Sequence, residues 1–152
     1  MRKILMLIPL VMATEAGALS CLPANLAETF ASRTALVAGL GHLTPLGPLP
    51  TPTAETPPVD VEMAFEGRLF GADAPETVLV RAMCFGSWCG TYPPSDETGL
   101  MIFDRTEAGL RLTVNPCGST FDRAPTPAKI AALERCAAGI CDAEEHAAFA
   151  AP

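Results

Sequence analysis

The residues of this chain with the most informative chemistry are its six cysteines, and half of them lie within one stretch, residues 81–118. In chain order they are Cys21, Cys84, Cys89, Cys117, Cys136 and Cys141. In an exported chain of modest size, an even number of cysteines is typical of a disulfide framework. We therefore predict three disulfides, although six cysteines allow about 15 connectivities and the sequence does not choose among them.

Two pairs of these cysteines have four residues between them, Cys84 with Cys89 and Cys136 with Cys141. Such pairs can be considered as zinc ligands, but thiols persist mainly in reducing compartments, so disulfides are the better prediction and we expect no metal. Cys136 falls in the last turn of a predicted helix and Cys141 lies beyond Gly139. That placement is compatible with a local bridge that pins the end of the helix.

The segment Ser87-Trp88-Cys89-Gly90 is similar to the active-site turn of thioredoxins. Thiol–disulfide exchange there needs a second, resolving thiol three residues after the first. Tyr92 stands at that position, so the dithiol is absent. We expect Trp88 to be an aromatic of the core or of a lid rather than part of a redox site.

The other residue types that support catalysis are scattered. They are the histidines His42 and His146, the serines Ser87, Ser95 and Ser119, and the adjacent acid pairs Asp96-Glu97 and Glu144-Glu145. No nucleophile-elbow motif surrounds any of the serines, and adjacent acidic residues more often solvate a loop. We predict that the protein is not an enzyme and holds no cofactor.

The N-terminus has the pattern of a secretory signal. Arg2 and Lys3 precede a short apolar run, residues 4–12, and Ala18-Leu19-Ser20 forms a small-residue cleavage site before Cys21. A membrane-spanning helix needs about 20 apolar residues, more than this run supplies. We expect residues 1–20 to be removed and the mature chain to be periplasmic or extracellular.

A lipoprotein is the alternative, because lipoprotein signals also end at a cysteine. Ala18 stands where a branched aliphatic residue is usual, and lipidation of Cys21 would leave five cysteines, one of them unpaired. We favour simple secretion, and expect membrane association only if Cys21 is lipidated.

The charge of the chain argues against nucleic-acid binding. The formal net charge is −7, and removal of residues 1–20 leaves eight basic and 16 acidic residues, which gives about −8. Binding to phosphates needs clustered Lys and Arg, and the mature sequence has no basic cluster. The negative charge is more simply read as a contribution to solubility.

Hydrophobic periodicity predicts five strands and two short helices in a single domain, residues 21–141, followed by a flexible tail, residues 142–152. The strands are expected at 34–43, 59–69, 77–83, 100–103 and 110–114, and the helices at 21–33 and 127–138, the second capped by Thr126. A proline-rich connection, residues 44–58, and a loop, residues 91–98, join some of them. Short strands with one polar face favour a five-stranded barrel.

These elements resemble those of the tissue inhibitors of metalloproteinases, in the netrin-like module superfamily, and of their bacterial relatives. A cysteine at the cleavage site opens a helix (CLPANLAETFASR), and the strands TALVAGL and VDVEMAFEGRLF follow. The next strand ends in Cys-x4-Cys-Gly, a hairpin runs into Asn115-Pro116-Cys117-Gly118, and a helix closes the chain. The resemblance implies a mainly β, OB-fold-like Greek-key barrel, stapled by disulfides, with an N-terminal and a C-terminal helix.

The resemblance also implies a partner and a mechanism. In the animal inhibitors, the α-amino group and carbonyl oxygen of the N-terminal cysteine bind the zinc of the protease, which gives Cys21 that role here. Those inhibitors begin Cys-x-Cys, whereas this chain begins Cys21-Leu22-Pro23 and lacks the second cysteine. The resemblance implies a disulfide from Cys21 to the 84–89 segment or, failing that, to Cys117.

The candidate binding surface combines Cys21–Ala24 with the 84–98 segment. Its contact residues would be Cys21, Leu22, Pro23, Phe85, Trp88 and Tyr92. Aromatic residues are enriched at protein interfaces, which favours a binding module with a protein partner. The resemblance implies that this partner is a metalloprotease. Two alternatives stay open: the aromatics cover one end of the barrel, or the protein is a structural component of the cell envelope.

Overall fold

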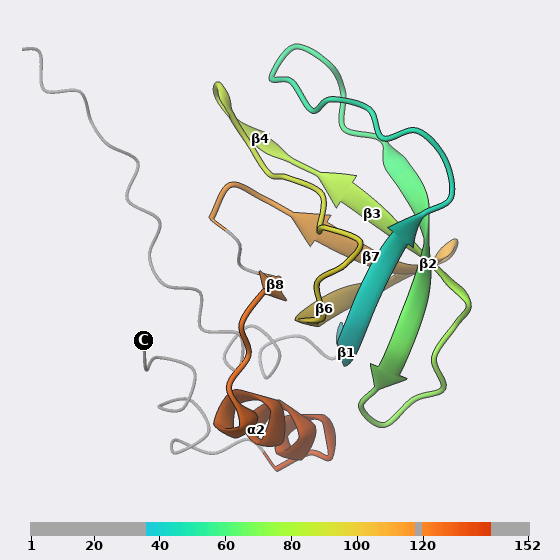
Figure 1. Ribbon diagram of the computed structural model, residues 1–152, viewed down its shortest axis with the longest axis vertical. Coiled ribbons are helices and arrows are strands. Elements are labelled where there is room, and N and C mark those ends of the chain that lie inside the picture. Colours follow the sequence, from blue (N-terminus) through green and yellow to red (C-terminus); the bar gives the residue numbers. More distant parts are fainter. Residues whose placement is uncertain (1–35, 118–119, 141–152) are drawn as a thin grey trace, which may run out of the picture.

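The computed structural model describes residues 36–117 and 120–140, and in that part the chain forms eight strands and one helix (Figure 1). The strands are β1 (Leu36–Pro45), β2 (Asp60–Leu69), β3 (Thr77–Ala82), β4 (Cys84–Phe85), β5 (Trp88–Cys89), β6 (Gly99–Thr106), β7 (Gly109–Val114) and β8 (Phe121–Asp122), and the helix is α2 (Pro127–Ala137). The helix predicted at 21–33 and the tail predicted at 142–152 lie outside the described residues.

Five of the strands close a barrel. They follow the order β1-β2-β3-β7-β6, and β6 pairs again with β1. All of these pairs are antiparallel except β3 with β7, which are parallel. The parallel pair arises because the chain crosses from β3 through β4, β5 and β6 before β7 returns in the direction of β3. The predicted five-stranded, OB-like barrel is confirmed, and its sheet is mixed.

Alternation along the strands separates two apolar layers. The barrel interior is filled by Val37, Leu43, Met63, Phe65, Leu69, Val78, Val80, Ala82, Met101, Phe103, Leu112 and Val114. In β2, Met63 and Phe65 point inward, while Glu62 and Glu66, which flank this pair in the sequence, are exposed. Phe65 and Phe103 meet edge to face, with their ring centroids 5.7 Å apart.

The second apolar layer lies outside the barrel, under α2. It contains Leu36, Ala38, Phe70, Leu100, Ile102, Ala132, Leu133 and Cys136. Because β6 contributes Met101 and Phe103 inward and Leu100 and Ile102 outward, both of its faces are buried. This explains why its sequence is a continuous apolar run instead of an alternating one.

Helix α2 has the termini that the sequence predicts. The side chain of Thr126 accepts a hydrogen bond from the backbone N–H of Lys129 at 3.2 Å, Pro127 is the first helical residue, and Gly139 follows with φ 85°. Lys129 Nζ pairs with Asp122 of β8 at 3.2 Å, which ties the helix to the barrel. No helix in the described part of the chain is long and apolar enough to cross a bilayer.

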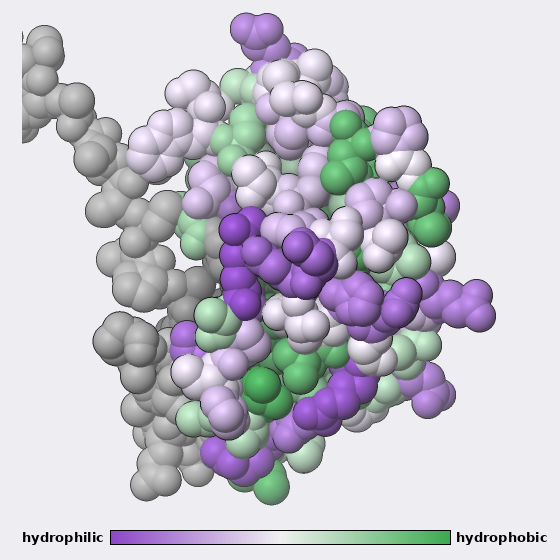
Figure 2. Space-filling view, viewed as in Figure 1, coloured by the Kyte–Doolittle hydropathy of each residue, from purple (hydrophilic) through white to green (hydrophobic). Residues whose placement is uncertain are grey.

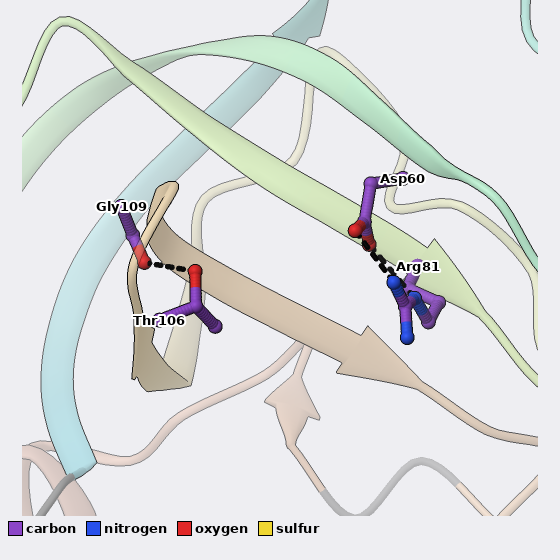
Figure 3. A network of polar contacts seen from close by, with 4 residues as sticks. All are labelled: Asp60, Arg81, Thr106 and Gly109. Atoms are coloured by element: carbon purple, nitrogen blue, oxygen red, sulfur yellow. Dashed lines mark hydrogen bonds and ion pairs between the residues drawn. The ribbon is translucent and has the colours of Figure 1, made fainter.

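Two polar contacts tie neighbouring strands together (Figure 3). The guanidinium of Arg81 on β3 donates two hydrogen bonds to the carboxylate of Asp60 on β2, at 2.8 and 2.6 Å. At the β6–β7 turn, Thr106 Oγ1 donates to the carbonyl oxygen of Gly109 at 2.8 Å. The first contact lies at the barrel end from which β4 and the β1–β2 loop extend, so it helps to hold the base of those segments (Figure 1).

Candidate functional site

The feature of the fold that the core does not explain is a short hairpin, Cys84–Cys89, here called the aromatic hairpin. It extends from the barrel end next to the β1–β2 loop (Figure 1). Cys84 pairs with Cys89 and Phe85 pairs with Trp88 across β4 and β5. Gly86 has φ 59° and no non-glycine residue has positive φ in the described chain, so Gly86-Ser87 has the pattern of a type II′ turn.

A disulfide joins Cys84 and Cys89, whose Cα atoms are 3.9 Å apart. Residues directly opposite one another on paired strands project from the same face, and successive pairs project from opposite faces. The disulfide therefore occupies one face of the hairpin, and Phe85 and Trp88 share the other. The covalent bond holds these two aromatic residues in one arrangement.

Phe85 and Trp88 are exposed to solvent, at 45% and 51% of their surface. Neither belongs to the two core clusters. Burial of a large aromatic side chain is worth several kcal/mol, so folding alone would favour a covered position. Of the two positions expected for Trp88, the core and a lid, the core is wrong, because the hairpin carries Trp88 away from the barrel interior.

The base of the hairpin is fixed to the barrel by backbone contacts. Met83 N donates to Val114 O at 2.8 Å, which extends the β3–β7 pairing, and Gly90 N donates to Met83 O at 2.8 Å. A side chain at Gly90 would bring its Cβ to 2.5 Å from Val114 O. Glycine is therefore required at this position, because the backbone that follows the hairpin passes directly against the end of β7.

Tyr92, which the sequence grouped with Phe85 and Trp88, lies in a different environment. It is half-buried and packs against the barrel core. It also lines a small cavity of about 110 Å³ with the proline-rich segment, residues 50–59, and with Met83 and Cys84. Burial raises the pKa of its phenol above 10.0. Tyr92 thus covers the barrel end, whereas Phe85 and Trp88 project from it.

A larger cavity of about 480 Å³, here called the seam cavity, adjoins the hairpin. It is lined by Trp88, Cys89, Gly90, Thr91, Val114, Asn115, Pro116, Phe121 and Arg123. Strand β6 has two different partners along its length. Its C-terminal end pairs with the part of β7 near Arg111, whereas Leu100 and Met101, near its N-terminal end, pair with β8. The cavity lies where β7 and β8 diverge, so it combines residues from three separate segments.

Arg123 is the basic residue among those that line the seam cavity. Its Nε lies 3.6 Å from Glu97 Oε2, which is longer than a hydrogen bond. Within the described residues Glu97 Oε2 is buried without a hydrogen-bond partner. The side chain of Arg123 is 54% exposed. The guanidinium therefore keeps donors that no described residue uses.

The disulfide corrects one expectation about the cysteines. Cys84 and Cys89 are bonded to each other, so neither is the partner of Cys21, and the prediction that favoured the 84–89 segment is wrong. Cys117 and Cys136 are also disulfide-bonded. The pairings of Cys117 with Cys21 and of Cys136 with Cys141 stay predictions, since Cys21 and Cys141 lie outside the described residues.

The structure therefore brings together only part of the predicted site. Phe85 and Trp88 form one surface, Tyr92 belongs to another, and Cys21, Leu22 and Pro23 lie outside the described residues. Sequence reasoning missed Phe121 and Arg123, which reach the seam cavity through the two-residue strand β8. A strand this short has no periodicity, so the sequence offered no signal for it.

In the part of the chain that the structure describes, His42 and the remaining exposed apolar residues lie on β1 and the β1–β2 loop, apart from the aromatic hairpin and the seam cavity, or at the end of α2. His42 lies on the outer face of β1, with its Nε2 3.5 Å from Glu66 Oε2. Further exposed apolar residues, Leu46, Leu49 and Val59, belong to the β1–β2 loop. Figure 2 shows the apolar surface on the viewed face as small patches separated by polar residues, with one patch over that loop.

Comparison of the chain with protein-family models, with curated proteins and with solved structures found no match.

Proposed function

We propose that this protein is an exported binding module that contacts a protein partner with its aromatic hairpin. The observation that carries the proposal is the exposure of Phe85 and Trp88 on a disulfide-bonded hairpin outside the core. Aromatic side chains anchor protein interfaces, and tryptophan is among the residues most often found at energetic hot spots. A folded barrel that exposes two of them on one rigid projection is suited to that use.

Rigidity supports the proposal as much as exposure does. Binding costs free energy for every side chain and loop that must be ordered, and a preformed contact surface lowers that cost. Here the disulfide, the Gly86 turn and the backbone contacts of Met83 and Gly90 order the hairpin before any partner arrives. Function in such folds resides in the loops that the scaffold presents.

The disulfide and the net charge support an oxidising compartment and one class of partner. A disulfide between Cys84 and Cys89 persists in an oxidising space, which supports export. The net charge of −7 disfavours nucleic acids and anionic membrane surfaces as partners. A protein with a neutral or basic surface around an apolar pocket suits this chain best.

One specific form of the proposal is inhibition of a metalloprotease through the α-amino group of Cys21. The five-stranded barrel and the disulfide bonding of Cys117 support it, because both belong to the scaffold that such a mechanism needs. Catalytic zinc keeps a position for water that a neutral amine can take. The test compares the mature protein with a version that carries one extra N-terminal alanine, against a panel of zinc proteases. Equal effects of the two versions, or no inhibition by either, would refute this form.

The test of the general proposal uses three immobilised versions of the oxidised protein. They are the wild type, the double variant Phe85→Ser/Trp88→Ser, and the control Ile140→Ser, which removes an apolar residue that is 59% exposed at the end of α2. We expect wild type and control to capture the same exported protein and the double variant to lose it. All three should unfold at similar temperatures, since exposed substitutions change stability by about 0.5 kcal/mol or less.

Two results would overturn the proposal. Capture of the same proteins by all three versions would show that the aromatic hairpin is not the contact. A large loss of stability in the double variant, on the scale of about 3–5 kcal/mol for a buried aromatic, would show that Phe85 and Trp88 serve the fold.

A further inference from the structure

The seam cavity offers a ligand both an apolar wall and one cation. Its apolar lining comes from Trp88, Val114, Pro116 and Phe121, and the cation is Arg123. Its volume of about 480 Å³ lies within the usual range for ligand pockets, about 300–1,000 Å³. An occupant that uses both features must carry an apolar group and a negative charge close together.

Arg123, as the basic residue of the cavity lining, limits the kind of anion that can bind there. With an overall charge of −7, the chain repels anions in general, so an anion needs a specific partner to bind here. The planar guanidinium of Arg123 can hold a carboxylate through two parallel hydrogen bonds. A phosphate carries more negative charge, and one arginine beside the Glu97 carboxylate is a poor match for it.

Among the described residues that line the cavity, few side chains have polar groups that could bind the hydroxyl groups of a sugar. Asn115 Oδ1 already accepts a hydrogen bond from Cys117 N at 2.8 Å. Among the lining side chains this leaves chiefly Thr91 and Arg123 for a ligand, whereas a saccharide presents several hydroxyl groups that need partners. A carboxylate next to one apolar side chain is the arrangement at the C-terminus of a polypeptide.

We infer that the seam cavity binds the C-terminal carboxylate of a polypeptide whose last residue is apolar. Arg123 holds the carboxylate, and Trp88 and Phe121 contact the last side chain. This inference rests on the proposed function and deepens it, because Trp88 belongs to both the aromatic hairpin and the cavity. Glu97 competes with the ligand for Arg123, from an ion pair at 3.6 Å that lacks a hydrogen bond.

The test uses Trp88 as a reporter, because it is the one tryptophan in the sequence. The probes are the peptide acetyl-Ala-Ala-Phe with a free carboxylate and the same peptide with a C-terminal amide. We expect the acid to produce a saturable shift of Trp88 emission to shorter wavelength, and the amide to bind at least about tenfold more weakly, as loss of a charge-assisted hydrogen bond implies.

Matched variants test whether Arg123 is the residue that binds the carboxylate of the peptide. Arg123→Gln should weaken binding of the acid at least about tenfold, whereas Arg105→Gln, which removes the same charge from an exposed position on β6, should leave it unchanged. Arg123→Lys keeps the charge but loses the planar fork, so it should fall between wild type and Arg123→Gln. Glu97→Gln should strengthen binding, since it removes the competing carboxylate. Thermal unfolding of each variant checks that it is folded.

Equal binding of acid and amide, unchanged binding by Arg123→Gln, or no saturable response of wild type at millimolar peptide would overturn the inference. Its failure can be told from failure of the proposed function. If the peptide does not bind but Phe85→Ser/Trp88→Ser still loses its captured partner, the cavity inference alone fails. If that double variant keeps the partner, the proposed function fails.

Discussion

The disulfide of the aromatic hairpin should stabilise the whole domain by a modest and calculable amount. The bonded cysteines are five positions apart, so the bond closes a loop of about six residues in the unfolded chain. For a loop of that length, the restriction of the unfolded chain is worth about 2 kcal/mol at 25 °C. We therefore expect Cys84→Ser/Cys89→Ser to lower the free energy of unfolding by about 2 kcal/mol.

That loss reaches the barrel only if the hairpin unfolds together with it. The contacts of Met83 N with Val114 O and of Gly90 N with Met83 O, both 2.8 Å, make this coupling. For a domain of this size 1 kcal/mol corresponds to about 4 °C, so the melting temperature should fall by about 8 °C. The assay is thermal unfolding followed by far-UV circular dichroism, under oxidising conditions that leave the bonds of Cys117 and Cys136 intact.

The two alternatives to this result are informative. An unchanged melting temperature would show that the hairpin opens independently of the barrel and that its backbone contacts do not couple the two. A fall of about 20 °C or more would show that the bond supports the core, which would contradict the description of the hairpin as a projection. Reductant is no substitute for the variant, since it would also break the bonds of Cys117 and Cys136.

Four further predictions concern single positions and the intact chain. Tyr92 is the one tyrosine in the sequence, and because burial raises its pKa above 10.0, its tyrosinate absorbance should appear at higher pH than in the unfolded chain. Because the folded state disfavours the tyrosinate, the contribution of Tyr92 to the free energy of unfolding should be constant below pH about 10 and should fall as the pH rises through the folded pKa of Tyr92. Denaturant titrations across that pH range would detect the fall. Leu133→Ala should cost about 2–5 kcal/mol, because Leu133 on α2 is fully buried against the outer face of the barrel, and a cost below about 1 kcal/mol would contradict that packing. Gly90→Ala should cost about 1–3 kcal/mol through its clash with Val114 O, measurable as a lower urea midpoint. The intact mass of the mature protein should be six hydrogens below that of the reduced chain, as three disulfides require of six cysteines, whereas a lipid adduct would identify a lipoprotein anchored at Cys21.

Much of the barrel could be predicted from local sequence patterns. The alternation of Met63 and Phe65 with charged residues identified β2 and its buried face, and the Thr126-Pro127 start identified α2. These patterns are readable because each reflects burial or capping within a few residues. The parallel pairing of β3 with β7 was not predictable in the same way, since it depends on how distant segments meet when the barrel closes.

The candidate site was less predictable than the fold, for physical reasons. Phe85, Trp88 and Tyr92 lie within eight residues of sequence, and their types do not reveal which ones pack inward. Tyr92 packs against the core, and it lines a cavity together with the proline-rich segment, which is distant in sequence. Phe121 and Arg123 join the seam cavity only because β8 pairs with β6. The spacing of the cysteines did not indicate which of them pair. The favoured partner for Cys21 proved wrong because Cys84 and Cys89, which are close in sequence, bond to each other.

The central claim is that Phe85 and Trp88 form a protein-binding surface, and the most direct measurement is the affinity of a captured partner for matched variants. Isothermal titration would compare the oxidised wild type with Phe85→Ser and with Ile140→Ser, each of which removes one exposed apolar side chain. Truncation of a hot-spot residue costs about 2 kcal/mol or more, so Phe85→Ser should raise the dissociation constant at least about 30-fold, while Ile140→Ser should change it less than about twofold. Equal dissociation constants for the three proteins would contradict the claim that Phe85 and Trp88 together form the binding surface.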